Sequence, residues 1–97
     1  MKNKTGNLNK LRQNIQKNDR EILILLTKRF RIVKRIIKFK KQNNIDIKNS
    51  NYELFLKNKY SYFLKDKESK NLLIEIIQSI FDISKKYQKL LSSRDEK

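Results

Sequence analysis

Residues 8–42 read LNKLRQNIQKNDREILILLTKRFRIVKRIIKFKKQ and decide the fold of this 97-residue chain. The stretch contains neither Pro nor Gly, the residues that most often end or kink a helix. Its apolar residues recur at alternating steps of three and four, the heptad-like spacing of a helix that packs along one face. The pattern predicts a single helix over about 8–42, on the order of 50 Å long at about 1.5 Å per residue. The apolar positions of this heptad face are Leu8, Leu11, Ile15, Ile22, Leu25, Ile32, Ile36 and Phe39.

Two shorter helices are expected after this stretch. Residues 43–51, NNIDIKNSN, are rich in side chains that favour turns and helix caps. Apolar residues then recur at helical spacing and predict a second helix over about 51–64 and a third over about 70–91. We therefore expect an all-α fold of three helices in one domain that spans 1–97, with its core over about 8–91. The third helix is expected to turn inward Leu73, Ile76, Ile77, Ile80, Ile83, Tyr87 and Leu91.

A first helix of this length exposes more apolar surface than two short helices can cover. A chain of 97 residues also buries only a modest core by itself. A second copy of the chain is the simplest partner for the heptad face. We therefore expect an intertwined helical homodimer.

The composition excludes several kinds of chemistry. The chain has no Cys, so it forms neither disulfides nor thiolate metal sites. It has no His either, and so lacks the commonest general base and metal ligand. We expect no metal site and, in an enzyme, a reaction that needs no conventional proton shuttle.

The net charge of +15 by itself suggests a nucleic acid or an anionic membrane as the partner. The lysines are nevertheless spread over the whole chain, and the abundance of Lys, Asn and Ile is typical of an AT-rich genome. We therefore expect binding to neither partner, and expect the positive surface to steer small anions to their site. The sequence has neither a run of about 20 apolar residues nor a secretory signal at its start, which favours a cytoplasmic protein.

Polar side chains interrupt the apolar stripes of the first and third helices. Arg29 occupies a position on the heptad face. Ser84 and Gln88 lie one turn apart in the third helix. Inward-facing cations and donors are costly unless they meet an anionic or polar group, so a buried site for a small anion is the first hypothesis. A plainer interpretation is a salt bridge or a snorkelling side chain for Arg29, and the edge of the core for the other two.

Three further charged residues belong to the candidate set. Lys40 follows Arg12 by four heptads, so a supercoiled helix places both on nearly the same side. Glu53 stands at the start of the second helix, where the helix dipole favours an acid in any protein. Taken singly, the two cations are also typical of a solvated surface.

The order and spacing of these residues resemble those of the all-helical chorismate mutases. The resemblance runs from about residue 8 to residue 91, and the chain looks most like the mutase domain that begins the bifunctional chorismate mutase–prephenate dehydratases. Each motif is short, and their order over one chain is more specific than any one of them. The motifs are Leu11-Arg12, Leu25-Leu26-Thr27-Lys28-Arg29, Lys38-Phe39-Lys40, Glu53-Leu54, and Ile80-Phe81-Asp82-Ile83-Ser84 followed by Gln88.

The resemblance implies a unimolecular Claisen rearrangement of chorismate to prephenate, in phenylalanine and tyrosine biosynthesis and without a cofactor. This fits the missing His and Cys, because a pericyclic reaction needs no acid, base, nucleophile or metal. The enzyme instead holds a flexible dianion in a compact chair and stabilises the charge that develops on the breaking ether oxygen. By matching position, Lys40 and Gln88 would donate to that oxygen, with Lys40 supplying most of the stabilisation.

The resemblance also implies the residues that bind the substrate. Arg12 and Arg29 would clamp its two carboxylates, which suits the bidentate geometry of a guanidinium group. In this family the first arginine reaches into the partner subunit's site, so Arg12 would act across the dimer. Glu53 would accept a hydrogen bond from the ring hydroxyl, and Ser84 would donate to a carboxylate.

Two positions depart from the family pattern. Asn49 stands where these relatives usually have Asp, and an amide can still form a hydrogen bond with a hydroxyl. Tyr52 stands where they have Arg just before the glutamate. The change removes a cation from the rim or wall of the site and is expected to weaken binding of the dianion, unless Lys48 compensates.

Three alternatives stay open at this point. An isochorismate–pyruvate lyase on the same scaffold would bind a substrate that differs mainly in the position of its hydroxyl, and Glu53 favours the mutase. A basic helical module for nucleic acid would turn Arg12, Arg29 and Lys40 to the solvent and bind with a steep salt dependence. A catalytically inactive helical dimer is the third, and Tyr52 is the feature that hints at it.

Overall fold

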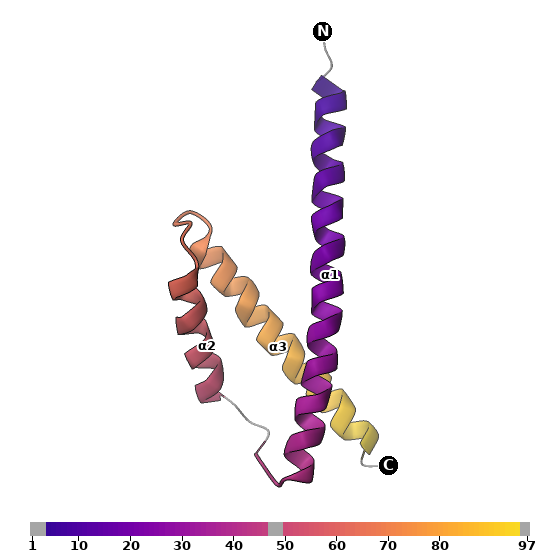
Figure 1. Ribbon diagram of the computed structural model, residues 1–97, viewed down its shortest axis with the longest axis vertical. Helices are drawn as coiled ribbons and strands as arrows, with labels where there is room; N and C mark the ends of the chain where they lie inside the picture. The colour runs from indigo at the N-terminus through magenta and orange to yellow at the C-terminus, as the bar shows by residue number, and fades with distance from the viewer. Residues whose placement is uncertain (1–3, 47–49, 96–97) are drawn as a thin grey trace. The chain divides into compact units, whose positions relative to one another are not determined.

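The structure is a computed structural model that describes residues 4–46 and 50–95, with side chains described over 4–46 and 51–92. Three helices make up the described chain: α1 over Lys4–Gln42, α2 over Ser50–Phe63 and α3 over Lys70–Asp95 (Figure 1). The all-α prediction and the long first helix are confirmed. The bounds of α2 agree with the sequence to one residue, whereas α1 begins four residues earlier than expected and α3 ends four residues later. In the described chain no helix is both long and apolar enough to cross a membrane.

The chain divides into two compact units, Met1–Ile32 and Val33–Lys97. The first unit holds the N-terminal part of α1. The second holds the last turns of α1 together with α2 and α3, and it contains Lys40, Glu53, Ser84 and Gln88 of the candidate set. The expectation of one domain over 1–97 stays a prediction.

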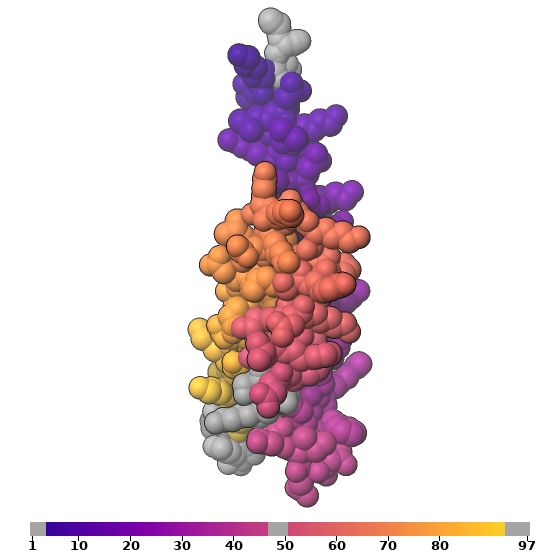
Figure 2. All heavy atoms as spheres, turned by 90° about the vertical axis from the view of Figure 1, so that its left-hand side faces the viewer, coloured from indigo at the N-terminus to yellow at the C-terminus, as the bar shows by residue number. Residues whose placement is uncertain are grey.

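Helices α2 and α3 pack along each other as an antiparallel pair (Figures 1 and 2). The link between them closes with backbone hydrogen bonds from Leu64 N to Tyr60 O at 2.9 Å and from Lys70 N to Asp66 O at 3.0 Å. Ser69 precedes α3 as its cap: its carbonyl accepts from Leu73 N at 2.8 Å, and its hydroxyl donates to Asp66 Oδ2 at 2.5 Å. This short, capped link holds the two helices in one register.

The end of α1 is fixed by a Schellman motif. Ile45 N donates to Lys40 O at 2.8 Å, and Asn44 N lies 3.5 Å from Lys41 O. Asn44 adopts the left-handed conformation with φ of 56°, which Asn tolerates better than most residues. The turn-rich composition of 43–51 therefore ends the helix as expected over the described residues 43–46.

Within the single chain, α1 buries a face other than the heptad face, which was expected to meet a second copy of the chain. Val33 and Ile37 are buried in the second unit, whereas their neighbours Ile32 and Ile36 on the predicted heptad face are exposed. A helix turns by about 100° per residue, so the buried pair lies on a different face from the predicted one. All the apolar residues of the heptad face are exposed in the single chain: Leu8, Leu11, Ile15, Ile22, Leu25, Ile32, Ile36 and Phe39.

The expectation for the third helix needs a correction. Ile76 and Ile83 were expected to face inward, but both are exposed, and Phe81 is buried in their place with 2% of its surface accessible. Leu73, Ile77 and Ile80 are half-buried, as are Tyr87 and Leu91. The single chain therefore buries one narrow stripe of α3 and leaves a second apolar stripe without cover inside the chain.

Candidate functional site around Glu53 and Ser84

Glu53 lies in the first turn of α2 on the face that meets α3. Its side chain is 20% exposed, and its Oε1 lies 3.0 Å from Nζ of Lys85 on α3. Leu56, Lys57 and Tyr60 follow on the same face at three, four and seven residues and are all half-buried. The carboxylate is therefore held at the α2–α3 interface and does not extend freely into solvent.

A chain of polar contacts continues from this ion pair along α3. Lys85 Nζ lies 3.9 Å from Asp82 Oδ1, and Gln78 Nε2 donates to the same oxygen at 3.0 Å. Gln78 Oε1 in turn accepts from Lys57 Nζ on α2 at 2.7 Å. Contacts at both ends of this chain bridge the two helices, so it fixes their register and places Glu53 opposite the turn of α3 that begins at Asp82.

The hydrogen bond to Glu53 raises the pKa of Lys85 above its ordinary value of 10.5. Desolvation opposes this effect and lowers the pKa, while the charges of Glu53 and Asp82 make smaller contributions that raise it. Lys85 is therefore a cation throughout the neutral range. Its effect on the site is that of a fixed positive charge.

Ser84 and Gln88 lie on α3, one turn apart, beside Lys85. Ser84 is buried in the core with 6% of its surface exposed, and its hydroxyl donates to Ile80 O at 2.9 Å. Gln88 is half-buried on the same face. Ser84 and Gln88 therefore interrupt the apolar stripe of α3 with polar side chains, as the sequence indicates. To donate to a substrate carboxylate, the Ser84 hydroxyl would first have to break its hydrogen bond to Ile80 O.

Lys40 belongs to the last turn of α1, within the second unit. Its side chain is half-buried, and its carbonyl is the acceptor of the Schellman motif. By the helical period, Lys40 lies about 60° around the helix from the buried Ile37. The base of this side chain is therefore part of a hydrogen-bonded helix end.

Arg12 and Arg29 belong to the first unit. Arg12 is exposed and Arg29 is half-buried. Their proposed grip on the substrate carboxylates, and the action of Arg12 on a partner subunit, stay predictions.

Of the two residues that depart from the family pattern, the structure describes Tyr52. Asn49 lies outside the described residues. Tyr52 is exposed and stacks on Phe55, with ring centroids 6.1 Å apart and planes 23° apart. Lys59 Nζ lies 6.0 Å from the centroid of the Phe55 ring. Tyr52 therefore joins an aromatic and cationic row along α2 and brings no charge to Glu53.

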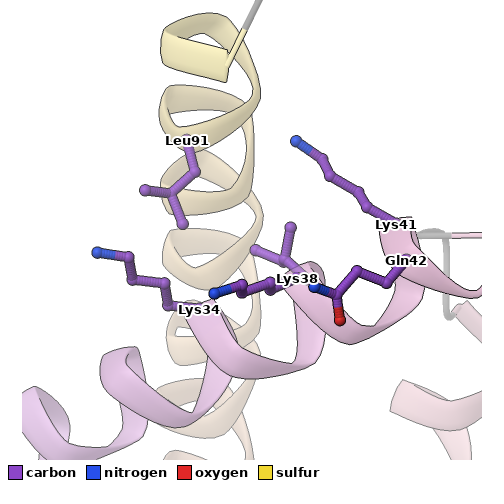
Figure 3. Close-up of a pocket in the computed structure, with 6 residues that line it drawn as sticks. Lys34, Lys38, Lys41, Gln42 and Leu91 are labelled. Atoms are coloured by element: carbon purple, nitrogen blue, oxygen red, sulfur yellow. The ribbon is translucent and has the colours of Figure 1, made fainter.

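An open pocket of about 270 Å³ lies between the ends of α1 and α3 (Figure 3). None of the candidate site residues predicted from the sequence lines it. Lys38 and Lys41 of the pocket lie on the opposite side of Ile37 from Lys40 by the helical period. The pocket is therefore distinct from the candidate site. Its lining residues are Lys34, Ile37, Lys38, Lys41, Gln42 and Leu91.

Within the second unit, Glu53 lies on α2 and Ser84 and Gln88 lie on α3, and the structure adds one residue that the sequence reasoning missed. Lys85 is the ion-pair partner of Glu53. Its place directly after Ser84, and three residues before Gln88, was visible in the sequence. In a chain with 25 Lys and Arg residues nothing distinguished it from the others. Over the described residues, no cluster of three or more His, Cys, Asp or Glu side chains is placed to hold a metal ion.

Comparison with known proteins bears on the same residues. A family model described as chorismate mutase type II matches residues 11–89. The match contains every residue of the candidate site, from Arg12 to Gln88. No curated protein and no solved structure matches the chain.

Proposed function

Because the chain belongs to the type II chorismate mutase family and is thereby an isomerase, we propose that it rearranges chorismate to prephenate for phenylalanine and tyrosine biosynthesis in the cytoplasm. The observation that carries the proposal is the match over residues 11–89. The special likeness to the mutase domain of bifunctional mutase–dehydratases stays a prediction from the sequence.

The proposed mechanism is electrostatic. Arg12 and Arg29 bind the two carboxylates and hold the substrate in its chair, and Ser84 adds a hydrogen bond to one of them. Lys40 and Gln88 donate to the ether oxygen, which gains negative charge as its bond to carbon breaks. Such preorganised donors stabilise the transition state more than the ground state, so they increase kcat.

Glu53 accepts a hydrogen bond from the ring hydroxyl in this mechanism. Its carboxylate is held at the α2–α3 interface by Lys85 at 3.0 Å, which supports a fixed acceptor. The same residue is the basis for preferring the mutase to the isochorismate–pyruvate lyase. A substrate with its hydroxyl elsewhere on the ring would leave this partly buried carboxylate without that partner.

We further propose that the active enzyme is an intertwined homodimer. The exposed heptad face of α1 supports this, because a second copy of the chain would cover it. Arg12 is exposed on that part of α1 and is the residue proposed to complete the partner's site. Each active site would then contain residues from both chains.

The burial of the candidate residues weakens the nucleic-acid alternative. That alternative requires Arg12, Arg29 and Lys40 to face the solvent, yet the last two are half-buried. It also gives no role to Ser84, which is buried in the core.

The decisive experiment follows the loss of chorismate absorbance on adding the purified protein, with prephenate and pyruvate both assayed in the products. Formation of prephenate alone supports the proposal. Release of pyruvate from isochorismate, with chorismate untouched, would transfer the assignment to the lyase. If neither substrate is consumed, the proposed reaction is wrong and binding to nucleic acid at several salt concentrations becomes the next measurement.

A further inference from the structure

The ion pair between Glu53 and Lys85 is formed although α2 offers other cations near the same carboxylate. Lys57 stands four residues after Glu53, the spacing at which a helix favours a Glu–Lys pair, but its amine donates to Gln78 on α3. Lys59 lies over the ring of Phe55. The described contact to Glu53 therefore comes from the opposite helix, and it ties the carboxylate to α3.

Lys85 occupies the part of α3 that carries the proposed site. It directly follows Ser84 and precedes Gln88 by three residues, so it lies about 100° and 60° around the helix from them. Its side chain is half exposed while that of Glu53 is 20% exposed. The cation is thus at the rim of the α2–α3 interface and the carboxylate is deeper.

The substrate makes this charge important. Chorismate is a dianion, and an uncompensated carboxylate beside it repels it in the ground state and the transition state alike. Tyr52, directly before Glu53, is uncharged and stacks on Phe55. The first turn of α2 therefore carries no cationic side chain of its own to offset Glu53.

We propose that Lys85 is a positioning residue for substrate recognition: it fixes the Glu53 carboxylate for the ring hydroxyl and neutralises it toward the incoming dianion. This inference rests on the proposed function, because it assigns Glu53 its role as hydroxyl acceptor. Lys85 supplies from α3 a compensating charge that Tyr52 does not supply from α2. An ordinary surface ion pair contributes little, so the effect must appear in substrate binding and not only in stability.

The test compares steady-state kinetics of the wild type with Lys85→Met, Lys85→Arg and Lys86→Met. Lys86 is exposed on the next position of α3, so its substitution is a control for the loss of one positive charge. We expect Lys85→Met to raise KM for chorismate about five- to tenfold with little change in kcat, because the lost interaction acts on both ground and transition states. Lys85→Arg should restore most of the affinity, and Lys86→Met should behave as the wild type.

A double-mutant cycle with Glu53→Gln separates positioning from a general loss of charge. With the glutamate neutral, Lys85→Met should change KM less than about twofold, because no carboxylate is left to hold or neutralise. An equal factor in both backgrounds would overturn the inference, as would a matching effect of Lys86→Met or a failure of Lys85→Arg to rescue. Lys85→Gln provides a second variant if Lys85→Met gives an altered circular dichroism spectrum.

The two proposals can fail separately. A wild type that produces no prephenate ends the proposed function and this inference with it. A wild type that produces prephenate, with Lys85→Met equal to Lys86→Met, ends only the inference. Turnover of chorismate by the wild type is therefore measured first.

Discussion

At the scale of single residues, the proposed function depends on a few polar side chains that are buried or half-buried. Ser84 is buried with its hydroxyl on Ile80 O at 2.9 Å, and Glu53 is held by Lys85 at 3.0 Å. Both side chains have their hydrogen-bonding capacity engaged by protein groups, which keeps the cost of burying them low. The two proposed donors to the ether oxygen, Lys40 and Gln88, are half-buried and therefore able to act where water is partly excluded.

These two donors give the first prediction. Lys40→Ala and Gln88→Ala should each lower kcat about a hundredfold or more, the typical loss of one preorganised donor, while the circular dichroism spectrum stays unchanged. Lys38→Ala is the matched control, because Lys38 is exposed two residues away and lies on another side of α1. Near-normal kcat in both donor variants would show that the site is assigned to the wrong residues.

At the scale of elements, the last turn of α1 determines where Lys40 is held. The Schellman motif places Asn44 at φ of 56°, and Ile45 N closes on the carbonyl of Lys40 at 2.8 Å. A residue with a Cβ and no compensating local hydrogen bond adopts this conformation only at a cost. The stability of this helix end is therefore linked to the base of a proposed catalytic side chain.

The second prediction concerns this cap. Asn44→Ala should lower the free energy of unfolding by about 1 kcal/mol, whereas Asn44→Gly should be nearly neutral, since Gly favours the left-handed conformation. Chemical denaturation followed by circular dichroism measures both. Equal destabilisation by the two variants would mean that the positive φ is not what the residue provides.

At the scale of the whole molecule, the exposed apolar surface is the main feature. The buried hydrophobic residues of the described chain are Val33, Ile37 and Phe81. Three such residues make a small core for a chain of 97 residues. The apolar residues of the heptad face of α1 are exposed in the single chain, as are Ile76 and Ile83 of α3. In the proposed homodimer, a second copy of the chain would cover the exposed heptad face of α1.

The third prediction tests that interface. Leu25→Glu should convert the dimer to a monomer in light scattering and lower the unfolding temperature, because it places a charge in the centre of the heptad face. Leu23→Glu is the control: Leu23 lies off that face, and its exposure of 63% in the single chain nearly equals the 62% of Leu25. If both variants have the mass of the wild type, the heptad face is not the dimer interface.

The fourth prediction tests the shared active site. Arg12→Ala and Lys40→Ala should each be nearly inactive alone, and a mixture should regain activity, because a heterodimer keeps one site with both residues intact. Subunit exchange is first verified by native mass spectrometry of the mixed proteins. Exchange without any recovery of turnover would place Arg12 and Lys40 in the same chain's site or remove one of them from it.

The sequence by itself determined the three helices, the break after Gln42 and the family. Helical periodicity, the absence of Pro and the Asn-rich turn are local signals, and the chain carries them wherever it packs. The order of Arg12, Arg29, Lys40, Glu53, Ser84 and Gln88 along the chain was likewise legible without coordinates.

Only the tertiary structure decided which helix faces are used and which cation meets Glu53. Val33 and Ile37 are buried in place of Ile32 and Ile36, because α1 offers two apolar faces and periodicity does not say which one meets the same chain. Lys85 was indistinguishable from many other lysines until the α2–α3 packing brought its amine to 3.0 Å from Glu53. Such a contact depends on the register of two helices across a turn, which no local pattern of residues encodes.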